Sequence, residues 1–124
     1  MLNYEISFLL ALVLTVSVET SLLYWLLRRF YTSQKFSQGL IIFAGVFASF
    51  ATLPYVWFIF PAFIHVRWLH TIVSEVSVTL IEAVFYSCVF RIGYRRALYL
   101  SLACNAASFV FGLALFPRLI KLVF

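Results

Sequence analysis

Long apolar runs recur four times along the chain, at residues 6–27, 39–60, 69–90 and 97–116. Each run is long enough to cross about 30 Å of hydrocarbon as a helix, at about 1.5 Å per residue. A helix satisfies its own backbone hydrogen bonds where water is absent, whereas a barrel would give short alternating segments. The pattern therefore predicts an all-α integral membrane protein, a four-transmembrane-helix bundle that forms a single domain over residues 1–124.

The composition supports this class. Of the 124 residues, 65% are hydrophobic and 10% are charged, and the mean hydropathy is +1.09. Soluble domains carry about 45–50% apolar and about 25% charged residues, and disordered chains carry fewer apolar residues still. No nucleophile and base pair, glycine-rich phosphate loop or metalloprotease motif occurs in the sequence. We therefore expect no enzyme activity and no cofactor.

The basic residues predict an orientation. Nine Lys and Arg against four acids give a net charge of +5, and no basic patch is interleaved with aromatic residues, so no nucleic-acid partner is expected. The first and third connections hold six bases, namely Arg28, Arg29, Lys35, Arg91, Arg95 and Arg96. The opposite side holds Arg67, Arg118 and Lys121. By the positive-inside rule, loops 28–38 and 91–96 are predicted to be cytoplasmic in a plasma or inner membrane, with the N- and C-termini outside.

Three prolines are expected to shape the helices. Pro54 lies within the second span and is predicted to kink it, because proline removes a backbone donor and crowds the preceding turn. Pro61 and Pro117 are expected to end the second and fourth helices.

The two halves of the chain, about residues 6–61 and 69–117, share a register that suggests an internal repeat. Glu19 precedes Arg28 by nine residues, and Glu82 precedes Arg91 by nine. The tripeptide at 48–50 recurs at 107–109. Because the first and third spans run in the same direction, the sequence predicts two tandem helical hairpins related as a parallel repeat. The alternative is that two hydrophobic hairpins align by chance.

Polar residues inside the spans are the most informative feature, because an ionisable residue costs about 2.5–3.5 kcal/mol at a helix centre. Glu19 and Glu82 both lie about 13 Å from the basic ends of their helices, and Asn105 and Ser49 reach nearly the same depth. The sequence therefore predicts a polar layer near the middle of the membrane.

Helical spacing places the polar residues on one face of each span. The third span has Glu75, Thr79, Glu82 and Tyr86, and the fourth has Ser101, Asn105, Ser108 and Gly112. The second has Gly45, Ser49 and Thr52, and the first has Thr15 and Glu19. We expect these faces to turn inward around a shared polar core, with Phe, Leu and Trp facing lipid.

Two functions remain open at this point. No Lys or Arg lies mid-span to neutralise the glutamates, so at least one is expected to be protonated, and the pair could share a proton or hold a cation. This favours a small transporter or channel component that moves a proton, a cation or a proton-coupled small solute. The candidate binding residues are Glu19, Glu82, Asn105, Ser108, Ser49, Tyr86, Thr79 and Glu75. The alternative is a non-catalytic subunit or an assembly and scaffold protein of a larger membrane complex, in which the polar residues serve helix packing.

The predicted partners follow from these two functions. They are the lipid bilayer, the transported proton, cation or solute, and either a second copy of the chain or a larger membrane complex. No metal site is expected at His65, His70 and Glu75, because steps of five residues do not stack on one helical face.

Overall fold

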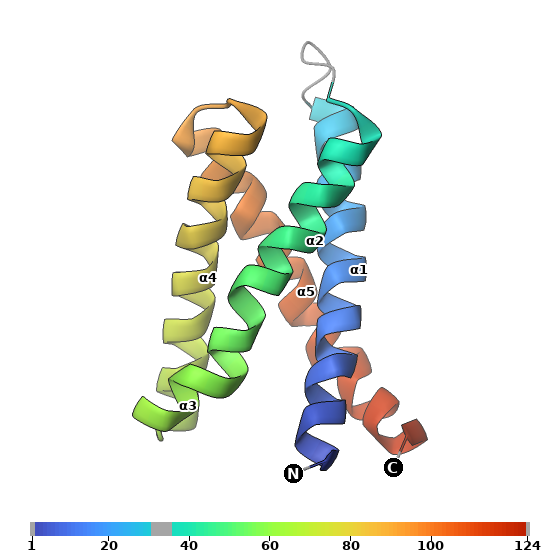
Figure 1. Ribbon diagram of the computed structural model, residues 1–124, viewed down its shortest axis with the longest axis vertical. Helices are drawn as coiled ribbons and strands as arrows, with labels where there is room; N and C mark the ends of the chain where they lie inside the picture. The colour runs from blue at the N-terminus through green and yellow to red at the C-terminus, as the bar shows by residue number, and fades with distance from the viewer. Residues whose placement is uncertain (1, 31–35, 124) are drawn as a thin grey trace.

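The computed structural model describes the backbone of residues 2–30 and 36–123, and Lys35 lies outside the described residues. The elements in chain order are α1 (Leu2–Phe30), α2 (Gln38–Pro54), the π-helical turn η1 (Tyr55–Ile59), α3 (Phe60–Phe63), α4 (Arg67–Phe90) and α5 (Tyr94–Val123). The segments α2, η1 and α3 follow one another without a break and form one rod (Figure 1). Over the described part of the chain the fold is all-α, and four helices are long and apolar enough to cross a membrane.

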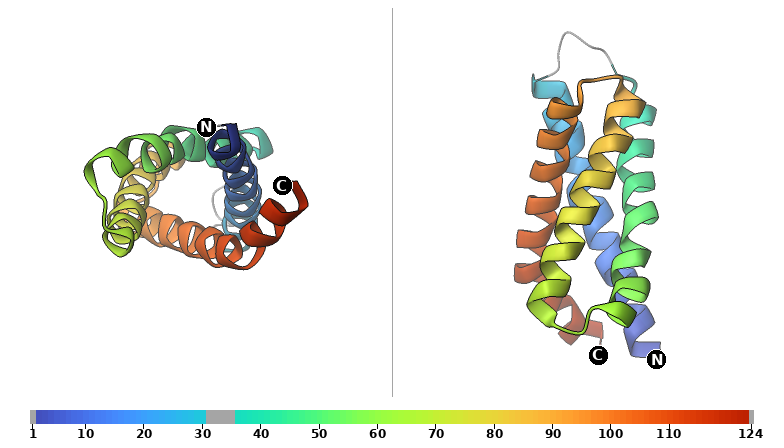
Figure 2. Two further views of the ribbon diagram at one scale, coloured as in Figure 1. Left: turned by 90° about the horizontal axis from the view of Figure 1, so that it is seen from below. Right: turned by 90° about the vertical axis from the view of Figure 1, so that its left-hand side faces the viewer.

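The four long helices form a ring, which is clearest in the end-on view (Figure 2). α1 packs against α2 and α5, and α4 packs against the same two neighbours. Both chain termini lie at one end of the ring, together with the connection between α3 and α4 (Figure 1). We call this the terminal end. The opposite end, which we call the basic end, is where α1 finishes, α2 begins and α4 turns into α5.

The bundle buries several polar side chains and exposes many large apolar ones. The buried polar and charged residues are Glu19, Ser49, Thr52, Ser74, Thr79, Glu82, Ser101 and Asn105. Large apolar side chains such as Phe43, Val110 and Leu113 are exposed around the outside. A buried polar layer together with an apolar outer surface is what a lipid solvent favours, so the bundle has the character of a multi-pass membrane protein.

The prediction that two prolines end helices was wrong. α5 continues through Pro117 to Val123 and changes direction only near its C-terminal end (Figure 2). The second rod passes Pro61 and ends at Phe63. A proline inside a helix deletes one backbone hydrogen bond and kinks the helix, but the turns on either side keep their own bonds.

The segment between Pro54 and Pro61 is wound as a π-helical turn. The amide of Phe60 bonds the carbonyl of Tyr55, five residues back. The sequence predicted a kink at Pro54, and the structure has this wider turn directly after it. Pro61 supplies no N–H to the carbonyl of Trp57, four residues before it, so this carbonyl is free for another donor.

Candidate functional site

The carboxyl group of Glu19 lies between two helices that each supply a hydroxyl. Ser49 Oγ of α2 donates to Oε2 at 3.0 Å, and Ser108 Oγ of α5 donates to Oε1 at 2.9 Å. Glu19 is 1% exposed. The predicted polar layer thus brings a carboxyl group of α1 into contact with both helices that neighbour α1.

Glu82 has the same kind of surroundings on the other side of the ring. Thr52 Oγ1 of α2 donates to Oε1 at 3.1 Å, and Asn105 Nδ2 of α5 donates to Oε2 at 3.1 Å. Glu82 is also 1% exposed. Each buried carboxyl group therefore accepts one hydrogen bond from α2 and one from α5, and each of its oxygens has one donor.

The three hydroxyl groups in this layer also lie near backbone carbonyl oxygens. Ser49 Oγ is 3.2 Å from the carbonyl oxygen of Gly45, and Thr52 Oγ1 is 2.9 Å from that of Ala48. Ser108 Oγ is 3.1 Å from the carbonyl oxygen of Asn105. A hydroxyl has one hydrogen and two lone pairs, so it can donate to a carboxylate, or donate to the backbone and accept from a carboxylic acid. The geometry accommodates both protonation states of the glutamates.

Close packing of α1 and α2 brings Glu19 and Ser49 within reach of each other. A Cβ atom added at Gly45 would lie 3.0 Å from Thr20 Cα, so only glycine allows this approach of the two helices. On the opposite side, Ser101 Oγ of α5 donates to the carbonyl oxygen of Thr79 at 2.7 Å, which ties α5 to α4. Small and hydroxylated residues thus set the helix spacing around the carboxyl groups.

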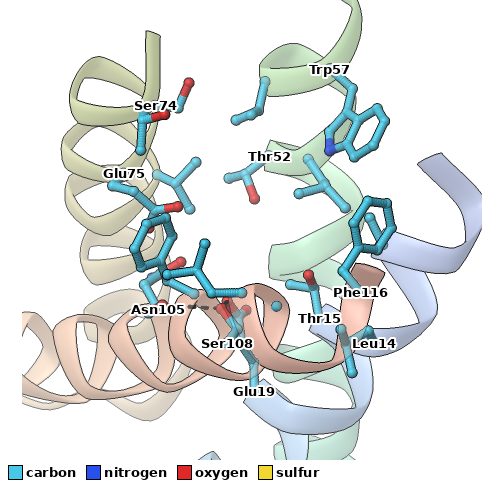
Figure 3. Close-up of a pocket in the computed structure, with 18 of the residues that line it drawn as sticks. Leu14, Thr15, Glu19, Thr52, Trp57, Ser74, Glu75, Asn105, Ser108 and Phe116 are labelled. Atoms are coloured by element: carbon cyan, nitrogen blue, oxygen red, sulfur yellow. Dashed lines mark hydrogen bonds between the residues drawn. The ribbon is translucent and has the colours of Figure 1, made fainter. Parts of the chain in front are cut away.

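A cavity of about 400 Å³ extends from the carboxyl layer toward the terminal end. Its inner part is lined by Glu19, Thr52, Glu82, Asn105 and Ser108, and its outer part by Trp57, His70, Ser74, Glu75 and Phe116. Figure 3 shows these walls, with Glu19 and Ser108 together on one side and Ser74 and Glu75 on α4. No Lys or Arg is among the described residues that line the cavity.

The basic half of the bundle is closed. Its interior is an apolar cluster that includes Leu23 and Leu27 of α1, Ile41 of α2, Phe90 of α4 and Leu100 of α5. Leu23 and Ile41 are fully buried. The cavity therefore ends at the carboxyl layer, and packed apolar side chains separate this layer from the basic end.

Two carbonyl groups of η1 lack the backbone donor that a regular helix would give them, and side chains from two other helices contact them instead. His70 Nε2 of α4 lies 2.9 Å from the carbonyl oxygen of Val56, and Tyr4 Oη of α1 donates to that of Trp57. In a regular helix these two carbonyls would bond residues 60 and 61, but Phe60 bonds Tyr55 and Pro61 has no N–H. The sequence signal for this irregular wall of the cavity was the pair of prolines in the second span, Pro54 and Pro61.

No protein-family model matches the chain, and no curated protein or solved structure matches it.

Most of the residues predicted for the site meet at the carboxyl layer or beside it. Ser49 and Ser108 contact Glu19, and Asn105 contacts Glu82. Glu75 lies farther out on the cavity wall, and no described residue forms a hydrogen bond with its carboxyl group.

Two other predicted residues are placed differently. Thr79 is buried and offers its backbone carbonyl to Ser101, as described above. Tyr86 lies in the apolar cluster of the basic half, and its buried hydroxyl has no hydrogen-bond partner among the described residues.

Sequence reasoning missed Ser74 as a site residue. Ser74 lies on α4, eight residues before Glu82, and it is buried against the cavity. A spacing of eight puts both residues on the same helical face, so this signal was present in the sequence.

The described residues contain no group of three or more His, Cys, Asp or Glu that could hold a metal ion.

Proposed function

We propose that this protein is a small membrane transporter that moves a proton, a cation or a proton-coupled small solute by way of Glu19 and Glu82. The observation that carries the proposal is the set of hydroxyl groups that lie between each carboxyl group and a backbone carbonyl. Such hydroxyls can follow the gain or loss of a proton by reversing their hydrogen bonds. A hydroxyl with a purely structural role would need only one arrangement, either donating to the carboxylate or donating to the backbone and accepting from the carboxylic acid.

The one-sided cavity favours a carrier over a permanently open pore. Solutes could reach the carboxyl layer from the terminal end, whereas the apolar cluster blocks the way to the basic end. Transport would then require that the basic half opens while the terminal half closes. In this scheme Glu19 and Glu82 alternate between the two sides, and we propose no catalytic activity.

The proposed carrier has a two-fold design. α1 and α2 would correspond to α4 and α5, as the register of the two halves suggests, with the axis along the membrane normal. The order of helices around the ring supports this, because each glutamate-bearing helix neighbours both α2 and α5. Superposition of the two hairpins in an experimental structure tests the repeat, and hairpins that do not superpose would reject it.

We also propose that the basic end faces the cytoplasm and that both termini are outside, in a plasma or inner membrane. Five of the described bases lie at the basic end, namely Arg28, Arg29, Arg91, Arg95 and Arg96. Single cysteines at positions 93 and 65, in a background without Cys88 and Cys104, should be labelled from opposite sides. Labelling of position 93 from outside would contradict this orientation.

Proton flux in proteoliposomes tests the proposed function. Purified protein is reconstituted with a pH-sensitive dye inside, and a potassium gradient with valinomycin drives the flux. The double variant of Glu19→Gln and Glu82→Gln should lose the flux, because glutamine keeps most hydrogen bonds but cannot exchange a proton. Glu5→Gln is the matched control, since Glu5 is an exposed acid in the first turn of α1. Undiminished flux in the double variant would refute the proposal.

A second candidate function, a subunit or scaffold of a larger membrane complex, is favoured by one feature of the outer surface. Ser17 and Ser21 are exposed on α1 and line a hollow of about 510 Å³ beside Ala107 of α5. Small residues four apart on a membrane helix allow another helix to approach closely. If a second copy or a partner helix binds at this hollow, Ser21→Leu should abolish the association, which crosslinking in native membranes would measure. A Ser21→Leu protein that still assembles but has a flux defect would favour the transporter.

A further inference from the structure

The outer part of the cavity contains a buried hydroxyl group without a partner. Ser74 is 3% exposed, and its Oγ forms no hydrogen bond with any described residue. It lines the same cavity as the carboxyl layer, on α4 (Figure 3). Buried hydroxyls nearly always have a partner, so this oxygen is available to a group that enters the cavity.

Glu75, the next residue of α4, lies where the cavity meets a second hollow. This second hollow, of about 320 Å³, runs between α4 and α5. We call it the α4–α5 groove, and apart from Glu75, Thr79 and Asn105 it is lined by apolar side chains, namely Val76, Leu80, Leu102, Ala106 and Phe109. Glu75 and Asn105 line both spaces. A polar binding position thus lies directly beside an apolar one.

The charge and the walls of the cavity select the chemical class of the ligand. Glu19, Glu75 and Glu82 line it, and no described Lys or Arg does, so an anion would be repelled. Across the cavity, the rings of Trp57 and Phe116 lie 6.1 Å apart, edge to face. Aromatic rings attract organic cations as well as apolar groups. An inorganic cation has no apolar part that could lie in the α4–α5 groove.

We infer that the substrate of the proposed transporter is an amphiphilic amine, whose protonated nitrogen is bound by Glu75 and Ser74 and whose apolar body lies in the α4–α5 groove. This inference rests on the proposed function, because it names the substrate class of the same cavity. The carboxylate of Glu75 pairs with the positive charge, and Ser74 Oγ accepts an N–H hydrogen bond. A quaternary ammonium ion has no N–H and cannot use Ser74.

Calorimetric binding to the full-length protein in lipid nanodiscs tests the inference, with empty nanodiscs as the blank. The probes are naphthylethylamine, its trimethylammonium analogue and the neutral alcohol naphthylethanol. The amine should bind at least about tenfold more tightly than the alcohol, because the alcohol cannot pair with a carboxylate. The trimethylammonium analogue should lie between the two.

Two variants with matched controls assign the residues. Glu75→Gln should raise the Kd of the amine at least about tenfold, and Glu5→Gln should leave it unchanged. Ser74→Ala should raise the Kd of the amine about threefold or more and leave that of the trimethylammonium analogue unchanged. Ser7→Ala is the control for the serine variant, because Ser7 Oγ donates to the carbonyl oxygen of Asn3 in its own helix and Ser7 lines neither the cavity nor the α4–α5 groove. Gel filtration and circular dichroism check folding, and the ligand series and Ser74→Ala keep the test valid if Glu75→Gln fails to fold.

Three results would overturn the inference: equal binding of amine and alcohol, an unchanged amine Kd in Glu75→Gln, or an equal effect of Ser74→Ala on both cations. Proton flux measured on the same preparations distinguishes a failure of the amine inference from a failure of the proposed transport function. Flux that depends on Glu19 and Glu82 without selective amine binding overturns only the substrate class. Amine binding that depends on Glu75, with flux unaffected in the glutamine double variant, supports the amine site and removes the proton coupling.

Discussion

Thr52 of α2 donates a hydrogen bond to Glu82 of α4 at 3.1 Å, across the interface between the two hairpins. One turn earlier on the same helix, Ser49 donates to Glu19 of α1. α2 therefore contacts both buried carboxyl groups, as α5 does through Asn105 and Ser108. A shift of either helix along its axis would change the hydrogen bonds of both glutamates together.

The Thr52 hydroxyl is predicted to matter more for transport than for stability. Thr52→Val keeps the shape and removes the hydroxyl, so we expect a loss of about 1 kcal/mol in stability, within the range of bonds between membrane helices. Proton flux should fall at least about tenfold, because Glu82 loses its only hydroxyl contact among the described residues. Unfolding in denaturing detergent and proteoliposome flux measure the two effects.

Thr71→Val is the matched control for this prediction. Thr71 also lines the cavity, but its Oγ1 bonds the carbonyl oxygen of Arg67 in its own helix at 3.1 Å and forms no hydrogen bond with a carboxyl group of the described residues. Its flux should match that of the unsubstituted protein. Equal flux in Thr52→Val and Thr71→Val would show that the hydroxyl beside Glu82 plays no part in proton exchange.

Much of this arrangement could be predicted from the sequence. A buried Glu in a lipid solvent needs hydrogen-bond partners, so equal depth of Glu19, Glu82, Asn105 and Ser49 was enough to predict a shared polar layer. Which donor pairs with which carboxyl group was not predictable. That pairing depends on the relative shift of α2 and α5, which is set by close contacts such as Gly45 against Thr20.

The ends of the helices and the π-helical turn could also not be predicted from the sequence. Hydropathy marks the hydrocarbon-spanning part of a helix, so it does not indicate that α1 begins at Leu2 or that α5 ends at Val123. The turn η1 lies between Pro54 and Pro61, and Pro61 supplies no N–H to the carbonyl of Trp57 within it. Its stabilising partners, Tyr4 and His70, come from distant parts of the chain.

Restoring the missing donor should convert the π-helical turn into a regular helix. In Pro61→Ala, the new N–H can bond the carbonyl of Trp57, and Phe60 can return to the carbonyl of Val56. His70 Nε2 would then lose its partner. We expect a change in the ¹⁵N chemical shift of His70 Nε2 by NMR of the protein in lipid.

Pro117→Ala serves as the control for the proline variant. It removes a proline from α5, which lies outside the second rod, so the His70 signal should stay where it is. An unchanged His70 signal in Pro61→Ala would mean that Pro61 does not cause the free carbonyl at Val56.

Gly45 is predicted to be the position where α1 and α2 tolerate no added carbon. Gly45→Ala would place its Cβ 3.0 Å from Thr20 Cα, so the helices must separate, and overpacking of this kind costs about 1–3 kcal/mol. Gly39→Ala is the control, because an added Cβ there meets nothing within 4 Å. Denaturing-detergent titrations should show a loss of stability in Gly45→Ala alone, and equal stability of the two variants would contradict the close approach.

Infrared difference spectroscopy of the reconstituted protein tests the central claim most directly, with carboxyl bands assigned by Glu19→Gln and Glu82→Gln. If the glutamates exchange protons through the cavity, their protonated and ionised bands should interconvert as the pH is changed and should shift when a cationic ligand is added. Bands that stay in the protonated form at every pH, with and without ligand, would identify buried structural hydrogen bonds and contradict a transport function for Glu19 and Glu82.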